Sequence, residues 1–357
     1  MEIHFRVDSS TNLGLGHVSR CLNLADALAG YRHQSTFFCR DLPGSTVPWI
    51  KSRGHRARIL KTSPETETEI EIDQLTDYEL YVIERHDFPS PDWIVVDAYA
   101  LGKEWELLAQ SDHARVMVID DFIDRPHNAD LYLNQNIISL ELRVLQSNDV
   151  KAKKNLLGPK FALLSSEYSE LRKKAKVRSG RIRQVFVYFG GVDQQDYLTR
   201  SLKCLTEVFG DDISVVLVAP EMGPNLEAIH TYCREFENIS IVDGGESLSR
   251  LMVDSQIAVG AFGATTWERA SLGLPVLGVA ISDNQNRVAE NAEKTGVGVV
   301  LPSDDTGFEL GLRKALLKLK KSGIGPSWSK RCFKVSDGLG SHRVAQAMIS
   351  FTPSASQ

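Results

Sequence analysis

A histidine in a glycine-rich loop is the first residue of the chain that could do chemistry. An apolar run over 3–7 ends in Asp8, a loop with Gly14 and Gly16 follows, and His17 stands where a helix is expected to begin. Glycine lets the backbone take up a positive φ and lets a ligand come close, and a helix start leaves N–H groups unpaired. The pattern places His17 at the carboxyl end of the first strand, where open α/β sheets bind their ligands. His17 is therefore either a helix cap or a general base.

Two glycine turns in the second half of the chain could hold a diphosphate. One is Gly190–Gly191, directly after an apolar run, and the other leads from Gly263 through Thr265 and Thr266 into a helix. Backbone N–H groups at a helix start, together with the threonine hydroxyls, would donate hydrogen bonds to an anion. Neither turn continues into the G-K-[ST] of a Walker motif, so ATP hydrolysis is not expected. Glu268, in the first turn of that helix, could accept hydrogen bonds from both ribose hydroxyls or could stabilise the helix dipole.

The spacing of the residues argues against a nicotinamide cofactor and against a metal. The dinucleotide fingerprint needs a third glycine at position 19, where Ser19 stands. The cysteines are odd in number, lie far apart and form no C-x-x-C pair, so neither a zinc site nor a disulfide framework is predicted. We expect no cofactor, and we expect the cysteines to be buried small apolar side chains. They are Cys21, Cys39, Cys204, Cys233 and Cys332.

Length and composition indicate a globular protein of two domains. The chain has 357 residues, whereas one hydrophobic core usually stops growing at about 250 to 300. Its 42% hydrophobic and 24% charged residues are ordinary for soluble proteins. The formal charge of −5 gives no electrostatic case for nucleic acid or an anionic membrane as a partner. Neither a long apolar run nor a signal-peptide pattern is present, so we expect a cytoplasmic protein.

Strand and helix patterns alternate through both halves of the chain. This alternation predicts an α/β fold of two Rossmann-like domains, each with a parallel sheet covered by helices on both faces, and a cleft between their facing strand ends. In the first half the strands are expected at 3–7, 34–39, 56–60, 93–97, 115–119 and 131–134. In the second half they are expected at 184–189, 213–219, 239–242, 256–259 and 298–301.

Polar and basic segments mark the expected domain boundary. Residues 141–154 are polar and 166–183 are strongly basic; the basic run could be a phosphate-binding patch or a solvated linker, and we favour the linker. The charged stretch 64–73 is expected to be a loop. We predict a first domain at 1–155, a linker at 156–183, a second domain at 184–340, and a terminal helix and tail at 341–357 that could pack back on the first domain.

Eight motifs, in order along nearly the whole chain, together resemble one family. They are D-S-S-x-x-x-G-x-G-H-x-x-R at 8–20, V-D-x-Y at 96–99, D-D-F at 120–122, L-N-Q-N at 133–136, L-G-P-K-F-A-L-L at 157–164, F-G-G-x-D at 189–193, T-T-W-E at 265–268 and D-N-Q at 283–285. The family is the UDP-2,4-diacetamido-2,4,6-trideoxy-β-L-altropyranose hydrolases of pseudaminic acid biosynthesis, with their spore-coat polysaccharide relatives.

The resemblance implies both a fold and a reaction. The fold is the two-domain glycosyltransferase-B architecture, as in the peptidoglycan transferase MurG. The reaction is attack of water on the anomeric carbon of a UDP-linked diacetamido sugar, with inversion, without a metal, and with release of UDP. The second domain would bind UDP, and the expected partners are the UDP-sugar and UDP, with no nucleic acid and no stable membrane association. We expect a monomer.

The family's roles can be carried over residue by residue. His17 matches the catalytic histidine; Asp8 would orient its imidazole or bind a sugar hydroxyl, and Asp97 and Tyr99 would contact the sugar or the water. The residues expected to bind UDP or the sugar are Gly14, Gly16, Arg20, Gly190, Gly191, Asp193, Gly263, Thr265, Thr266, Glu268, Asn284 and Gln285.

Three other functions fit the same fold. A glycosyltransferase would pass the sugar to an acceptor in surface polysaccharide or glycoprotein synthesis, a hydrolysing 2-epimerase would need further acids and bases at the sugar ring, and an inactive nucleotide-sugar-binding partner would not need His17. The identity of the sugar is left open, because Ser19 and the segments 64–73 and 141–154 match no pattern of the family.

Overall fold

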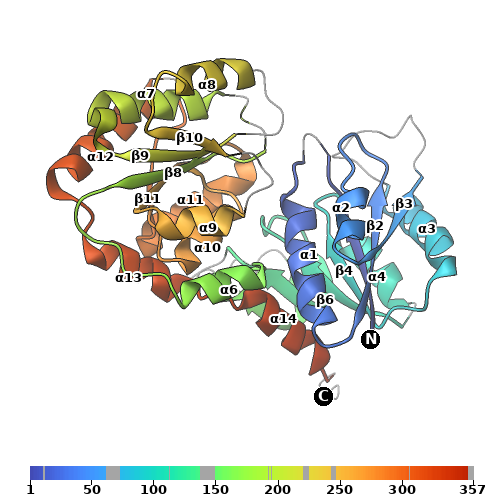
Figure 1. Cartoon of the computed structure of the whole chain (residues 1–357). Coiled ribbons are helices and arrows are strands. Elements are labelled where there is room, and N and C mark those ends of the chain that lie inside the picture. Colours follow the sequence, from blue (N-terminus) through green and yellow to red (C-terminus); the bar gives the residue numbers. More distant parts are fainter. Residues whose placement is uncertain are drawn as a thin grey trace. The chain divides into compact units, whose positions relative to one another are not determined.

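The chain folds into two compact units. The computed structural model describes residues 1–10, 13–61, 73–111, 113–136, 149–191, 193, 195–219, 225–242, 247–304 and 306–352 (Figure 1). The first unit comprises Met1–Leu164 and Leu339–Gln357, and the second comprises Ser165–Gly338. The boundary at Leu164 and Ser165 falls inside the segment 156–183 that we predicted as a linker. The stretch 62–72, and with it most of the predicted loop at 64–73, lies outside the described residues.

The first unit contains a seven-stranded parallel sheet, in the order β3-β2-β1-β4-β5-β6-β7. Its strands are β1 (Glu2–Val7), β2 (Gln34–Arg40), β3 (Arg56–Leu60), β4 (Trp93–Asp97), β5 (Arg115–Ile119), β6 (His127–Asn134) and β7 (Val150–Leu157). Its helices are α1 (Gly16–Ala29), α2 (Val47–Ser52), α3 (Gln74–Glu84), α4 (Lys103–Ser111) and α14 (Gly340–Ile349), with 3-10 turns η2 (Arg85–Asp87) and η4 (Pro159–Phe161).

Helices cover both faces of this sheet, and β4 shows why. Every residue of β4 is buried, because a strand inside a parallel sheet has an apolar layer on each side. Trp93 and Val95 pack in the core on the α1 and α14 side, while Ile94 and Val96 pack on the α3 and α4 side. Figure 1 shows α1 and α3 on opposite sides of the sheet. The alternation of a strand's side chains thus divides the core of the first unit into two layers.

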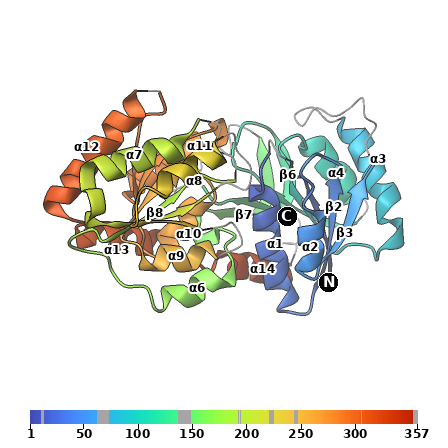
Figure 2. The same ribbon diagram turned by 45° about the horizontal axis from the view of Figure 1, so that its top comes forward.

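The terminal helix α14 belongs to the first unit. Val344 and Met348 are fully buried in the same core layer as Leu24 and Leu28 of α1, and α14 lies beside α1 in both views (Figure 2). The hydroxyl of Ser341 donates to the carbonyl of Leu164 at 2.7 Å. The end of the chain therefore completes the hydrophobic layer that carries α1.

Strand β7 was missed by the sequence analysis. We had taken the polar segment from 141 onwards for the end of the first domain, but 150–157 pairs with β6 in parallel register, while 137–148 lies outside the described residues. The strand's lysines hid it, because β7 is at the edge of the sheet and an edge strand carries charged side chains that discourage further pairing. Leu156 is buried, and Lys153 pairs with Asp130 at 2.7 Å.

The second unit repeats the plan with six parallel strands in the order β10-β9-β8-β11-β12-β13. The strands are β8 (Gln184–Tyr188), β9 (Ser214–Val218), β10 (Ile239–Val242), β11 (Ile257–Ala261), β12 (Val276–Val279) and β13 (Gly298–Val300). The helices are α6 (Ser166–Arg172), α7 (Tyr197–Phe209), α8 (Leu226–Cys233), α9 (Leu248–Asp254), α10 (Thr265–Ser271), α11 (Asp283–Thr295), α12 (Gly307–Ser322) and α13 (Pro326–Val335), with the turn η5 (Gly210–Asp212). Figure 1 shows α7, α8 and α12 on one side of this sheet and α9, α10 and α13 on the other.

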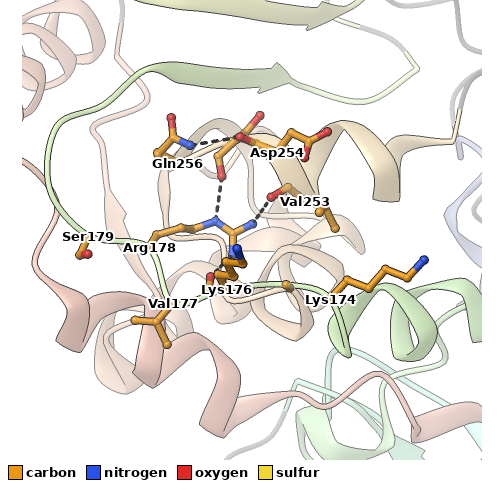
Figure 3. Close-up of a pocket in the computed structure, with 10 residues that line it drawn as sticks. Lys174, Lys176, Val177, Arg178, Ser179, Val253, Asp254 and Gln256 are labelled. Carbon is orange, nitrogen blue, oxygen red and sulfur yellow. Dashed lines mark hydrogen bonds between the residues drawn. The ribbon is translucent and has the colours of Figure 1, made fainter.

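Two arginines of the basic run 166–183 are built into the second unit. Arg178 is 6% exposed, and its guanidinium donates to the carbonyl oxygens of Met252, Val253, Ser255 and Leu272. Its side chain forms one wall of a hollow of about 380 Å³ that Lys174 and Lys176 also line (Figure 3). Arg172 donates in the same way to Ser271, Phe333 and Ser336. The last carbonyl groups of a helix have no partner within the helix. These two arginines donate hydrogen bonds to such carbonyl groups, so their guanidinium groups serve the fold of the second unit and not a phosphate.

The structure also bears on the cysteines and on membrane-spanning helices. All five cysteines are buried and none forms a disulfide, as predicted. Within the described ranges, no helix has the length and apolarity that crossing a membrane requires.

Candidate active site

Three of the four predicted catalytic residues of the first unit, His17, Asp97 and Tyr99, meet at the carboxyl ends of its strands. Strands β1, β4, β5 and β6 are consecutive neighbours and run parallel, so the segments that follow them emerge side by side. His17 lies in the first turn of α1, Asp97 ends β4, and Asp121 and Asn136 follow β5 and β6. Gly14 has a φ of 72°, as the loop required, and no atom of the described residues lies within 4 Å of where a side chain would begin at Gly14 or Gly16. Within the described part of the chain, nothing therefore fills the space beside these two glycines.

The imidazole of His17 is hydrogen-bonded to Asp97. His17 Nδ1 lies 2.7 Å from Asp97 Oδ1, and both side chains are buried. An ionised carboxylate can only accept a hydrogen bond, so Nδ1 carries the hydrogen and Nε2 carries the lone pair. No hydrogen bond among the described residues engages Nε2. The pair has the arrangement of a general base whose second nitrogen is oriented by a carboxylate.

Arg20 joins this pair to a second carboxylate. Its Nε and Nη2 donate to the two oxygens of Asp97 at 2.7 and 2.6 Å, and Nη1 donates to Asp121 Oδ2 at 2.8 Å. Burial opposes the charged forms, but Asp121 and Asp97 raise the pKa of Arg20 well above its usual range. Arg20 and then His17 hold the pKa of Asp97 well below its usual range. In this structure Arg20 binds carboxylates of its own chain, and the substrate contact predicted for it stays a prediction.

Tyr99 lies against the imidazole. The rings of Tyr99 and His17 meet edge to face, with their centres 4.6 Å apart, and the Tyr99 hydroxyl donates to Asp121 Oδ2 at 2.7 Å. Asn136 Nδ2 donates to Asp121 Oδ1 at 2.8 Å. Asp121 and Asn136 belong to two of the family motifs, D-D-F and L-N-Q-N, but the sequence analysis predicts no catalytic or binding role for either. For Asp121 the available signal was that it follows β5, whose neighbour β4 ends in the predicted site residue Asp97. Asn136 follows β6, which has no such neighbour, so the sequence held no comparable signal for it.

Asp8 belongs to a different network. Its Oδ1 accepts from Arg6 Nη1 at 2.6 Å and from the backbone N–H of Arg40 at 2.8 Å, and its Oδ2 accepts from Arg40 Nε at 2.9 Å. Burial raises the pKa of Asp8, but Arg6 and Arg40 outweigh it and hold that pKa below its usual range. Of the two roles considered for Asp8, orientation of the imidazole falls to Asp97 in this structure.

The glycine turns of the second unit also lie at neighbouring strand ends. Gly190 and Gly191 follow β8, Gly263 follows β11 and α11 follows β12, and these three strands are adjacent. Gly190 has a φ of 107°, and no atom of the residues that the structure describes lies within 4 Å of an added side chain's Cβ at Gly190 or Gly191. Gln285, at the start of α11, reaches the same place, since its Nε2 would lie 3.6 Å from a Cβ on Gly263. The turns after β8, β11 and β12, which are distant in sequence, therefore lie side by side at the carboxyl ends of these strands.

Other predicted binding residues have partners within the second unit. Asp193 caps α7 by accepting from the backbone N–H groups of Tyr197 and Leu198 at 3.0 and 2.8 Å, and burial raises its pKa. Thr266 is 1% exposed and lies near Arg269, while Thr265 is only partly covered. Asn284 Oδ1 accepts from the Ser282 hydroxyl at 2.6 Å, and Gln285 Oε1 accepts from the backbone of Ile281 at 3.2 Å.

Glu268 is half-buried beside Tyr168. Burial raises the pKa of Glu268, against the effects of the Tyr168 hydroxyl and of Arg269, and its Oε2 has no hydrogen-bond partner among the described residues. A buried acceptor without a donor is costly, and a pair of ribose hydroxyls is the kind of donor that would satisfy it. Both readings of Glu268, as a ribose acceptor and as a charge at a helix start, stay open. Within the described ranges, no three His, Cys, Asp or Glu side chains gather as metal ligands would.

Comparisons with known proteins support the resemblance that the motifs suggested. No family model matches the chain. It is 24% identical over 304 residues to the UDP-2,4-diacetamido-2,4,6-trideoxy-beta-L-altropyranose hydrolase of Campylobacter jejuni, an alignment that spans 84% of this chain and 98% of that protein. It is 23% identical over 293 residues to the uncharacterized protein MJ1062 of Methanocaldococcus jannaschii, spanning 78% of this chain but only 55% of that longer protein.

Solved structures identify the fold. MurG of Acinetobacter baumannii superposes with a TM-score of 0.67 at 13% identity, covering 98% of this chain and 99% of MurG. LpCGTa in complex with UDP superposes with a TM-score of 0.65 at 15% identity, covering 98% of each chain. Together with the two parallel sheets and their order, these matches confirm the predicted glycosyltransferase-B fold.

Proposed function

We propose that this protein acts on a UDP-sugar and, more specifically, hydrolyses a UDP-linked 2,4-diacetamido-2,4,6-trideoxy sugar in nonulosonic acid biosynthesis. The observation that carries the proposal is the hydrogen bond between His17 and Asp97, which orients the free Nε2 of the imidazole beside an open glycine loop. The similarity to the Campylobacter hydrolase over nearly its whole length supports the choice of substrate.

In the proposed reaction the first unit activates water. The oxygen of the water bonds to the anomeric carbon while His17 Nε2 takes one of its protons. Asp97 stabilises the imidazolium through the Nδ1 hydrogen bond, as a carboxylate does for a histidine base. The bond between the anomeric carbon and the phosphate oxygen breaks, and its electron pair leaves with UDP. Attack from the face opposite UDP inverts the configuration, and His17 later releases its proton to solvent.

The second unit would bind the leaving group. We assign the diphosphate to the turns at Gly190, Gly191 and Gly263, with Thr265 and Gln285 at their sides, and the ribose to Glu268. Backbone donors that stabilise charge as it develops on the leaving UDP are typically worth about 3 kcal/mol each. Asn284 is assigned to the phosphate or to an amide of the sugar.

Glycosyl transfer is the second candidate. The same histidine and aspartate could deprotonate a hydroxyl of an acceptor, and solved structures that share the fold include MurG and LpCGTa, the latter in complex with UDP. The two functions differ in what accepts the sugar, because a hydrolase releases UDP in water alone.

The deciding experiment measures UDP release from UDP-2,4-diacetamido-2,4,6-trideoxy-β-L-altropyranose without an acceptor, with the anomer of the free sugar followed by NMR. We expect sustained release with inversion, unchanged by a chelator, and loss of release in His17→Leu with UDP affinity within about threefold of the wild type. Tight UDP binding without release would favour the transferase. Turnover in His17→Leu would remove the histidine from the mechanism, and a metal requirement would overturn the proposed stabilisation of UDP.

A further inference from the structure

Asp121 accepts hydrogen bonds from three separate elements around His17. Arg20 Nη1, from α1, donates to its two oxygens at 3.0 and 2.8 Å. The Tyr99 hydroxyl, after β4, donates at 2.7 Å, and Asn136 Nδ2, after β6, donates at 2.8 Å. Asp121 is only 7% exposed. A buried carboxylate with four such contacts is held firmly, and it holds its donors in turn.

The positive charge of Arg20 opposes protonation of a base at His17. A histidine base gains strength from an adjacent carboxylate, because the negative charge favours the imidazolium. Here Arg20 donates two hydrogen bonds to that carboxylate, Asp97, and its guanidinium Nη2 lies 3.2 Å from His17 Nδ1. The positive charge of Arg20 therefore cancels the charge of Asp97 at the point where the imidazolium must form.

The negative charge of Asp121 offsets the positive charge of Arg20. With Asp121 included, Arg20, Asp97 and Asp121 together carry one net negative charge, so the four residues sum to zero when His17 takes a proton. Without Asp121 the same proton would leave a buried net positive charge, which is unfavourable where water is largely excluded. Among the described residues, Asp97, Arg20 and Tyr99 are the titratable or charged groups that contact the imidazole. Asp121 contacts Arg20 and Tyr99, and the Cys21 thiol donates to Asp97 at 3.4 Å.

We infer that Asp121 is the positioning residue that sets the base strength of His17, by supplying the charge that Arg20 removes from Asp97. It also fixes Tyr99 edge-on to the imidazole, since the hydroxyl hydrogen of Tyr99 is committed to Asp121. The inference rests on the proposed function for its effect on rate, whereas its effect on His17 protonation is independent of any substrate.

The test compares Asp121→Asn with Asp124→Asn. Both substitutions remove one carboxylate charge from the segment after β5, but Asp124 is exposed and pairs with Arg125. The ring of His17 is titrated by NMR in protein with isotope-labelled histidine, assigned with His17→Leu, and the pH dependence of kcat/KM is measured in parallel. In Asp121→Asn the imidazole should take up its proton at a pH lower by roughly one unit, because the charge that favours the imidazolium is gone.

The kinetic readout should follow the titration. We expect kcat to fall about tenfold or more with KM within about threefold, because Asp121 acts through His17 and does not bind the substrate. The acid limb of the rate profile should move to lower pH by the same amount as the NMR midpoint. Asp124→Asn should leave the NMR midpoint of His17 unchanged and kcat within about twofold of the wild type.

Two results would overturn the inference. One is an unchanged His17 midpoint in folded Asp121→Asn, and the other is an equal shift in Asp124→Asn. Should Asp121→Asn fail to fold, Asp121→Glu keeps the charge and should keep the wild-type midpoint; a downward shift there would equally refute the charge argument. A wild-type protein that does not hydrolyse the UDP-sugar would refute the proposed function alone, because the titration would still decide the role of Asp121.

Discussion

His17 Nδ1 and Asp97 Oδ1 lie 2.7 Å apart although 80 residues separate them in the chain. The contact exists because β1 and β4 are neighbours in the sheet, with Val7 paired to Asp97. The first turn of α1 therefore starts beside the end of β4. The tautomer of His17, and with it the availability of Nε2, depends on this single long-range pairing.

Replacing the aspartate should disable the base while leaving nucleotide binding intact. Asp97→Asn preserves the shape of the side chain but presents an amide that can stabilise the wrong tautomer and cannot stabilise an imidazolium. We expect kcat to fall by about a thousandfold or more, as for other oriented histidine bases. UDP affinity, measured by calorimetry, should stay within about threefold, because UDP is assigned to the second unit.

The matched control is Asp87→Asn, which removes a carboxylate of the first unit whose side chain is 62% exposed. Its turnover should match the wild type. A loss of less than about fivefold in Asp97→Asn would mean that the hydrogen bond to His17 does not serve catalysis.

Glu268→Ala should separate ribose binding from diphosphate binding. If the unpartnered Oε2 accepts from the ribose, its removal should weaken UDP binding about tenfold or more and pyrophosphate binding less than about twofold. Both affinities can be measured by competition against the UDP-sugar. Glu290→Ala, which removes a largely exposed glutamate of the same unit, is the control and should change neither. Equal losses for UDP and pyrophosphate would restrict Glu268 to a charge at the helix start.

The sequence predicted that the candidate site lies at the carboxyl ends of the strands, but not which side chains meet there. Strand patterns and glycine turns are local, so the ends of β1, β4 and β8 could be located within a few residues. The order of strands in a sheet is set by contacts between distant segments. Without it, orientation of His17 was considered for Asp8, and Asp97 was expected to contact the sugar or the water. In the structure Asp97 holds the imidazole, while Asp8 pairs with Arg6.

Asp120 and Asp121 show a second limit. The two are adjacent in sequence and both follow β5, yet Asp120 accepts from Tyr132 and from the backbone of Ile123, whereas Asp121 accepts from Arg20. Successive side chains of extended chain point to opposite faces, so neighbours of the same type serve different layers. Residue type alone gives no means of separating them.

His127 should make the stability of the first unit depend on pH. Its Nδ1 lies 2.6 Å from Glu106 Oε1 and its Nε2 lies 3.8 Å from Asp120 Oδ2, all without exposure to solvent. Burial alone would lower the pKa of His127, but Asp120 and Glu106 raise it to about 9, from an ordinary 6.5. A raised pKa stabilises the fold fully below pH 6.5, and the stabilisation is lost as pH rises through about 9.

The expected loss over that interval is about 3 kcal/mol in the free energy of unfolding. Chemical denaturation at a series of pH values between 6.5 and about 9 measures it. His127→Gln should flatten this dependence, whereas His86→Gln, at a fully solvated position with a 90% exposed side chain, should preserve it. The same slope in His127→Gln as in the wild type would show that other groups carry the pH dependence.

Arg178→Met should destabilise the second unit. The guanidinium donates to four backbone carbonyl oxygens, including Met252 and Val253 at the end of α9, and burial lowers the pKa of Arg178 to about 10. Methionine fills a similar volume but donates nothing, so carbonyl groups are left unpaired at a cost of about 2 to 4 kcal/mol. The measurement is the thermal unfolding of the protein together with hydrogen exchange in the peptides that cover α9.

Arg181→Met is the matched control, because Arg181 belongs to the same basic run but its side chain is 73% exposed, in an ion pair with Asp212. An exposed ion pair contributes at most about 1 kcal/mol, so this variant should unfold and exchange almost as the wild type does. Equal effects of the two substitutions would mean that the basic run acts through its overall charge. Faster exchange in α9 for Arg178→Met alone would establish that this arginine holds the helix end, and that the run is part of the second unit's structure.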